Sequence, residues 1–469
     1  MTVTTSASTT STTSEAEAAA WESPYGTALT WLVAGTFFLA VGGLLMLLAA
    51  AQSASPGLVS IGAATSVGRV RAAAHVLLVY GGLGMIGNGV ALDLARRAAR
   101  APASMEKASK AAGALMTLGV ALSALAVLTG RSTGRVGFEM PRPLAVVLAL
   151  AQLLVLLAVL RTVSRRTRDE VHPSMWFVVA ALFCAPFVIL GGALPGVRGI
   201  NDEIVLAFGL SGLKLLWLVP LGIGVALYVV PNAARAPLHS RQLAAVAFWG
   251  WFVFAPFAGP MRLVASSSQD WLETLGIAAS IALGVPILAV VVLLIATYAR
   301  RTSLAHGADL RYALAGVALL ALWGALSVPT AGRSAAAYVH GTVAADGLAE
   351  LALFGVAGAL LLAGVLHSVP NVTGNRLANP RIAGGSVWLL AIGAAVIALS
   401  LLVAGYVQGV LWAQGVRTGV ETFAGGGFVD VVNAVKPMLW LRVLGEALVA
   451  LAWVVAFQQV FSTSTAGEE

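Results

Sequence analysis

Long hydrophobic runs alternate with short polar stretches along the whole chain after residue 22. Each run has about 20 residues or more, which is the length that an α-helix needs to cross the hydrocarbon core of a bilayer. The pattern therefore predicts an all-α, polytopic membrane protein with twelve transmembrane helices. The predicted spans are 29–51, 70–95, 109–129, 142–162, 173–195, 203–230, 242–265, 272–297, 309–328, 338–368, 384–410 and 436–460.

The composition supports this fold class. Of 469 residues, 59% are hydrophobic and only 10% are charged, whereas a soluble domain has about 25% charged residues. This excludes a water-soluble enzyme, a coiled coil and a disordered chain. The single cysteine, Cys184, excludes an internal disulfide, a Cys-x-x-Cys redox pair and a Cys-x-x-Cys-His haem attachment.

The distribution of basic residues indicates an orientation. Loops after even-numbered helices contain sixteen Lys and Arg residues, and loops after odd-numbered helices contain ten. Because basic residues concentrate in cytoplasmic loops, we expect a protein of the cell (inner) membrane with both termini in the cytoplasm. The net charge of +8 is attributed to these loops rather than to a nucleic-acid partner. The expected organisation is a disordered cytoplasmic tail at 1–22, a twelve-helix domain at 23–462 and a cytoplasmic tail at 463–469.

Few polar or ionisable side chains lie within the predicted helices, and each charge costs about 2.5–3.5 kcal/mol on insertion scales. Asp346 and Glu350 are four residues apart, so both lie on one helix face, and Arg442 and Glu446 have the same spacing. These groups are either mutually neutralised structural pairs or part of a proton or ion pathway. The side chains singled out as candidates are His75, Asn88, Asp93, Lys214, Arg262, His340, Asp346, Glu350, His367, Arg442 and Glu446.

The six histidines form no sequence pair typical of a metal site, since His-x-x-x-His and Glu-x-x-His spacings are absent. His75 lies near the outer end of the second predicted helix. A histidine in such a place is more often a hydrogen-bonded structural residue than a ligand. Residue types and spacing alone therefore predict a twelve-helix membrane protein with a few buried charges.

Several local strings occur in a fixed order between about residues 60 and 460. The second predicted helix begins with GRVRAAAH at 68–75, the tenth begins with YVHGT at 338–342, and the eleventh contains AGYVQGVLW at 404–412. In order and spacing, the strings resemble the large subunit (subunit I) of the haem-copper oxidase superfamily, closest to the cbb-type cytochrome c oxidases and the nitric oxide reductases. The other matching strings are YVVP at 228–231, GP at 259–260, DWLETLG at 270–276, KPM at 436–438 and LRVLG at 441–445.

The chain departs from this family at the positions that hold the cofactors. The resemblance implies six histidine ligands: one on helix 2, one on helix 6, an adjacent pair on helix 7, and two on helix 10. Only the helix 2 ligand remains, as His75, so five of the six histidines are replaced. Counted from the matching strings, the replaced positions are Ser211, Met261, Arg262, Leu348 and Glu350.

The replacements imply the loss of the dinuclear centre, because these side chains cannot supply the ligands that copper and a high-spin haem require. We expect neither cofactor. One haem b could remain on His75, with Glu350 as a weak second ligand. We also expect Lys214 and Arg262 to approach Asp346 and Glu350, forming a neutral charge cluster in the space that the cofactors leave.

Three functions stay open at this point. The first is a structural or accessory subunit of a respiratory electron-transfer complex, which is not an enzyme on its own. Its partners would be membrane lipid and other subunits, such as one carrying c-type haem. The second is an active cbb-type terminal oxidase or nitric oxide reductase subunit with unrecognised ligands. The third is a transporter that uses the buried charge cluster.

Overall fold

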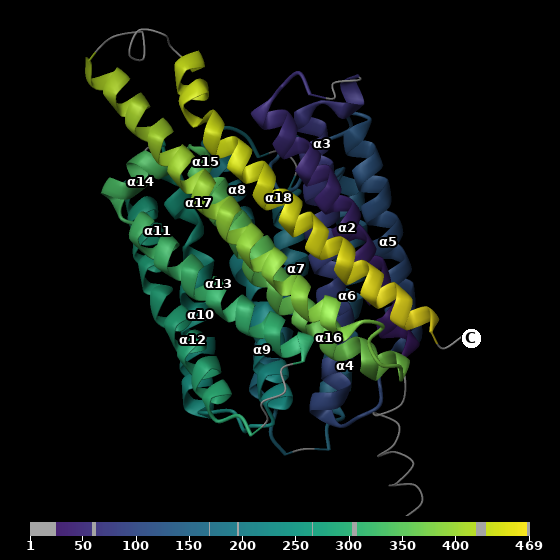
Figure 1. The fold of residues 1–469 in the computed structure, drawn as a ribbon. Helices are drawn as coiled ribbons and strands as arrows, with labels where there is room; N and C mark the ends of the chain where they lie inside the picture. Colours follow the sequence, from purple (N-terminus) through teal and green to yellow (C-terminus); the bar gives the residue numbers. More distant parts are fainter. Residues whose placement is uncertain are drawn as a thin grey trace, which may run out of the picture.

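The computed structural model describes residues 25–58, 62–167, 169–194, 197–264, 266–302, 307–418 and 428–466. These residues are helical or irregular, and no strand is found among them. In the described part of the chain, twelve helices are long and apolar enough to cross a membrane (Figure 1). The predicted all-α, twelve-helix architecture is confirmed. The expected N-terminal tail, 1–22, lies outside the described residues.

Seven of the twelve spans are single uninterrupted helices. Two of them, α17 and α18, extend past the predicted spans 384–410 and 436–460, because their ends carry polar residues that hydropathy assigns to loops. The last helix also includes residues 463–465 of the expected C-terminal tail. The seven helices are α2 (Gly26–Ala54), α5 (Glu106–Leu128), α6 (Arg142–Ser164), α7 (Pro173–Gly192), α13 (Ala308–Thr330), α17 (Pro380–Thr418) and α18 (Phe428–Thr465).

The other five spans are composite. Span 2 joins α3 (Val67–His75), the π-helical segment η2 (Val76–Gly84) and α4 (Met85–Ala99); span 6 joins α8 (Ile200–Gly212), the π-helical η3 (Leu213–Leu218) and α9 (Val219–Ala234). Span 7 joins α10 (Arg241–Phe254) to the short turns η4 (Ala255–Phe257) and η5 (Gly259–Leu263), and span 8 joins α11 (Asp270–Ala282) to α12 (Gly284–Ala299). Span 10 joins α15 (Val343–Glu350), the π-helical η6 (Leu351–Ala357) and α16 (Gly358–Thr373), after the short helix α14 (Arg333–Val339).

Spans 2, 6 and 10 form the centre of the bundle. Their most apolar windows are 94%, 83% and 83% buried, against 39–56% for the other nine. Each central span contains one π-helical segment, and these segments start directly after His75, Gly212 and Glu350. Short π-helical segments within α-helices are frequent at functional sites. The three segments therefore indicate a candidate functional site at the level of the bundle where His75, Gly212 and Glu350 lie.

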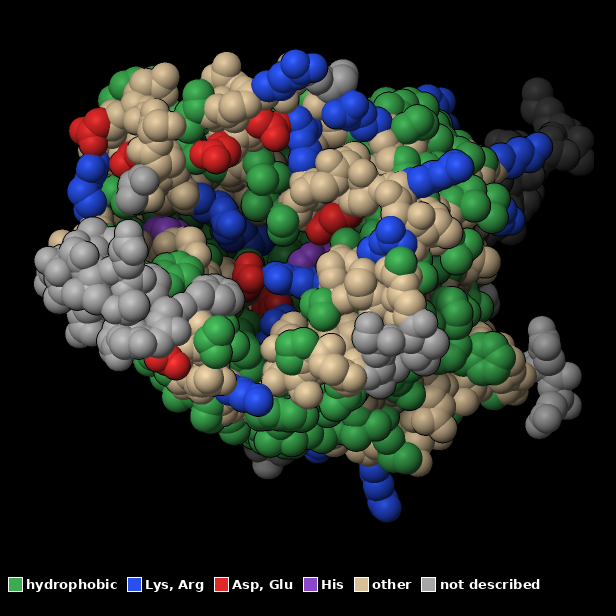
Figure 2. Space-filling model, turned by 90° about the horizontal axis from the view of Figure 1, so that it is seen from above, with side chains coloured by type: hydrophobic (Ala, Val, Ile, Leu, Met, Phe, Trp, Pro, Cys, Tyr) green, Lys and Arg blue, Asp and Glu red, His purple; other side chains and the backbone are tan. Residues whose placement is uncertain are grey.

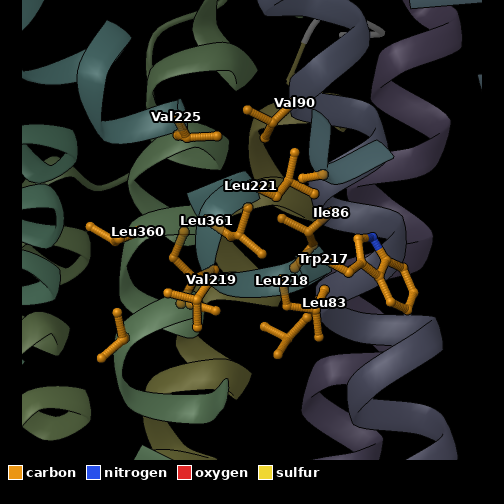
Figure 3. Packing of buried hydrophobic residues seen from close by; sticks show 14 of the residues in the cluster. Leu83, Ile86, Val90, Trp217, Leu218, Val219, Leu221, Val225, Leu360 and Leu361 are labelled. Atoms are coloured by element: carbon orange, nitrogen blue, oxygen red, sulfur yellow. The ribbon is translucent and has the colours of Figure 1, made fainter. Parts of the chain in front are cut away.

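Below that level the central spans pack against each other mainly through large apolar side chains. Figure 3 shows Leu83 and Ile86 of span 2, Trp217 and Leu221 of span 6, and Leu361 of span 10 in one cluster. All five side chains are almost completely buried. The outer helices close around this core, and α18 lies beside both α17 and α2, so that the last helix meets the first (Figure 1).

Candidate functional site

Two neighbouring cavities lie near the end of the bundle at which α3, α8 and α15 begin. Seen from above, this face is hollowed, with Lys or Arg, Asp or Glu, and His side chains inside the hollow (Figure 2). The first cavity, about 70 Å³, is lined by Arg71, His75, Lys214, Arg262, Asp346 and Glu350 together with Val79, Val136, Gly137, Leu210, Leu213, Ala349, Leu353 and Phe354. The second cavity, about 70 Å³, is lined by Ser211, Lys214, Leu215, Ala258, Met261, Arg262, Ser280, Leu283, Ile287, Trp323, Ser327, His340, Ala345 and Leu348.

Lys214 and Arg262 line both cavities and so stand between them. Lys214 lies in the π-helical segment of span 6. Arg262 lies in the tight turn η5 that ends span 7, and the glycine at the start of this turn is in close contact with α8: a Cβ built on Gly259 would come within 2.9 Å of a backbone oxygen. The two cations thus enter the site from different spans, on closely packed backbone.

The four residues of the predicted charge cluster all line the first cavity. Within the described part of the chain, Lys214 and Arg262 make no ion pair with Asp346 or Glu350. Asp346 is bound instead by Arg71, with 2.8 Å between Nη2 and Oδ2. Arg71 is four residues before His75 on α3, so both side chains lie on the helix face that lines the first cavity.

Glu350 is bound by Arg442 of α18, with 2.7 Å between Nη2 and Oε1. The Nε atom of the same arginine lies 3.5 Å from Glu446, which is the predicted pair within one helix. All three side chains are less than 8% exposed. One guanidinium therefore lies within ion-pair distance of two buried carboxylates, and Oε2 of Glu350 has no hydrogen-bond partner among the described residues.

His75 contacts a carboxylate that the sequence did not single out. Its Nδ1 atom lies 3.6 Å from Oε1 of Glu139, which is itself fixed by the backbone N–H of Gly137 at 2.9 Å. Glu139 lies in the connection between α5 and α6, where hydropathy gives no reason to expect a buried acid. A carboxylate on one imidazole nitrogen orients the ring and leaves Nε2 for another partner.

His340, which follows the short helix α14, also belongs to the site, because it lines the second cavity. Its Nε2 atom is buried without a hydrogen-bond partner among the described residues. Burial, together with the positive charges of Arg262 and Lys214, lowers the pKa of His340 to about 4. The imidazole is therefore neutral at physiological pH.

The lining of the second cavity can be compared with what a dinuclear metal centre requires. Ser211, Met261 and Leu348 meet around this cavity, as expected from the resemblance. Leucine has no donor atom for a haem iron, and the two cations on the cavity wall would repel a copper ion. Among the described residues no group of three or more His, Cys, Asp or Glu side chains could hold a metal ion. These residues do not fit a copper ion or a high-spin haem.

Comparisons with known proteins agree with the architecture. The chain is 23% identical to "Cytochrome c oxidase subunit 1" of Rhodobacter capsulatus over 361 residues, covering 73% of this chain and 67% of that protein. It is 21% identical to "Cbb3-type cytochrome c oxidase subunit CcoN1" of Stutzerimonas stutzeri, covering 70% and 71%. A solved structure of a haem-copper terminal oxidase dimer has the same fold, with a TM-score of 0.70, 14% identity, and coverage of 94% of this chain and 84% of that one. Residues 26–448 match the family described as "Cytochrome C and Quinol oxidase polypeptide I", and the chain belongs to this family of haem-copper oxidase large subunits.

Proposed function

We propose that this protein is an accessory subunit of a respiratory electron-transfer complex that lacks a dinuclear oxygen-reducing centre of its own. The observation that carries the proposal is the lining of the second cavity. Ser211, Met261 and Leu348 meet where the family places imidazoles, and Lys214 and Arg262 add two positive charges. These side chains cannot supply the metal ligands that the reduction of oxygen or nitric oxide requires.

The first cavity supports a narrower statement about cofactors. His75 keeps an imidazole whose Nδ1 faces Glu139, while Glu350, at the opposite ligand position, is engaged by Arg442. We propose at most one haem b per chain, on His75, and no copper. The proposed partners are membrane lipid and other respiratory subunits, including one that carries c-type haem.

Purification from native membranes, with haem and metal analysis of the same sample, tests this proposal. We expect no stoichiometric copper, no carbon monoxide difference spectrum, and no more than one b-type haem per chain. A His75→Ala variant should lose any haem that the native chain carries. Two b-type haems with one copper, together with oxygen or nitric oxide consumption by this chain, would instead establish an active oxidase or reductase. Uptake of an ion by vesicles that contain only this chain would establish a transporter.

The proposed orientation places both tails in the cytoplasm. In a Cys184→Ser background, a cysteine at Ser6 should react with a membrane-impermeant maleimide only after lysis. A cysteine at Ser132, exposed in the connection between α5 and α6, should react in intact cells. The reverse pattern would contradict the orientation.

A further inference from the structure

The second cavity has an unbalanced charge. Lys214 and Arg262 line it, and no acidic side chain is found among the described residues that do so. The acids of the neighbouring first cavity are already engaged, Asp346 by Arg71 and Glu350 by Arg442. Asp346 acts on both cations across the shared wall, but within the described residues neither cation has an acid at ion-pair distance, and such cations are costly inside a membrane protein. The cavity therefore favours an anion.

The remaining walls supply hydrogen-bond donors on one side and apolar surface on the other. Ser211 and Ser327 contribute hydroxyl groups, whereas the hydroxyl of Ser280 donates to the carbonyl oxygen of Ala258 at 3.4 Å. The buried Nε2 atom of His340 has no partner in the described part of the chain. The apolar wall consists of Met261, Leu283, Ile287, Trp323 and Leu348. A ligand that fits both walls has a compact anionic head and a short apolar body.

We propose that the second cavity binds the carboxylate of a small aliphatic acid, with its head between Lys214 and Arg262 and its chain against Trp323 and Leu348. The guanidinium fork suits a planar carboxylate, which it can bind through two hydrogen bonds. The proposal rests on the proposed function, because a dinuclear centre would occupy the same space. Entry is from the hollowed face of the bundle (Figure 2).

Calorimetric titration of the detergent-solubilised full chain with sodium butanoate tests the proposal. Butanamide has the same shape without the charge, and we expect it to bind at least tenfold more weakly. Acetate lacks two methylene groups, each of which tightens binding about fourfold when it is buried, and should bind about sixteenfold more weakly. Inorganic phosphate, an anion without an apolar body, should bind more weakly than butanoate.

Variants locate the site. Arg262→Gln and Lys214→Gln should each weaken butanoate binding at least tenfold, whereas Arg161→Gln, a change at an exposed helix end, should leave it unchanged. Neither cation holds a carboxylate, so both variants should melt within a few degrees of the native chain. If only one of them folds, its titration alone decides the outcome.

The proposal is overturned if butanamide binds as tightly as butanoate, if phosphate binds more tightly than butanoate, or if the two variants bind butanoate like the native chain. Haem and copper analysis of the same preparation distinguishes a failure of the proposed function from a failure of the carboxylate site. A chain with two haems and copper overturns the proposed function. A chain without them that does not bind butanoate overturns only the carboxylate site.

Discussion

The buried arginine of α18 offers the sharpest test of how the charges in this bundle are balanced. Arg442 is 7% exposed and lies 2.7 Å from Glu350 and 3.5 Å from Glu446, which are 6% and 2% exposed. In an Arg442→Met variant the aliphatic part of the side chain is kept, but two carboxylates lose their only guanidinium within ion-pair distance in the described part of the chain. Breaking a buried pair from one side costs about 3–5 kcal/mol.

The corresponding change in melting temperature follows from the length of the chain. If unfolding gains no more than about 2.1 cal/mol/K per residue, the entropy change for 469 residues is at most about 1 kcal/mol/K. A loss of 4 kcal/mol then lowers the melting midpoint by at least about 4 °C. Circular dichroism or intrinsic fluorescence of the detergent-solubilised chain measures this shift directly.

Two further variants make the test specific. Lys110→Met removes a pair with Glu106 at 3.0 Å whose side chains are 61% and 50% exposed, and should cost less than about 1 kcal/mol. Adding Glu350→Gln to Arg442→Met removes one of the stranded carboxylates and should recover part of the loss. If Arg442→Met melts like Lys110→Met, the ion pairs of Arg442 with Glu350 and Glu446 do not contribute the stability assigned to them.

Three other predictions concern packing, hydrogen bonding and pH. Gly409→Val should destabilise the chain by several kcal/mol, because a Cβ at this position would lie 2.1 Å from a backbone oxygen of α14. Gly385→Ala should be neutral, because no described atom lies within 4 Å of its new Cβ. Thermal melts of the two variants compare these effects. Asn88→Leu should cost about 1–3 kcal/mol by leaving the buried amide of Gln152, its partner at 3.0 Å, unsatisfied, and the double change to leucine should recover much of this in the same assay. His340 has a pKa of about 4 in the folded chain and about 6.5 in the unfolded chain, so the unfolded chain takes up the proton first as the pH falls. Between pH 6.5 and pH 4 this should lower the free energy of unfolding by up to about 3 kcal/mol. A His340→Gln variant whose melting temperature kept the same dependence on pH would contradict this.

Hydropathy was sufficient to predict the architecture, since a helix that crosses a bilayer needs little more than a long apolar run. The spacing of Arg442 and Glu446 was likewise enough to predict their contact, because residues four apart share a helix face. Pairing between helices was not predictable in this way. Which cation reaches Asp346 depends on which faces of the central spans meet, and spacing within one helix says nothing about that.

Arg71 illustrates this limit. In the sequence it lies at the edge of the predicted span 70–95 and counts with the basic residues of the adjoining loop, and Lys214 and Arg262 are the evident partners for Asp346. In the structure α3 begins at Val67, so Arg71 is already helical and its side chain lines the cavity together with His75. Glu139 was missed for a related reason, because a buried acid in a connection has no signature in the hydropathy pattern.

The contrast between the two levels of the central spans bears on whether the charges are incidental. Lower in the bundle, spans 2, 6 and 10 fill their shared interior with large, uncharged side chains such as Leu83, Trp217 and Leu361 (Figure 3). One level higher, the same three spans leave two cavities and line them with cations and acids. Apolar side chains of similar volume would stabilise a purely structural bundle at least as well as buried ion pairs do. Within the described residues, Lys214 and Arg262 have no acid at ion-pair distance, and both face an open space. Their retention is therefore better explained by a ligand that enters that space than by support of the fold.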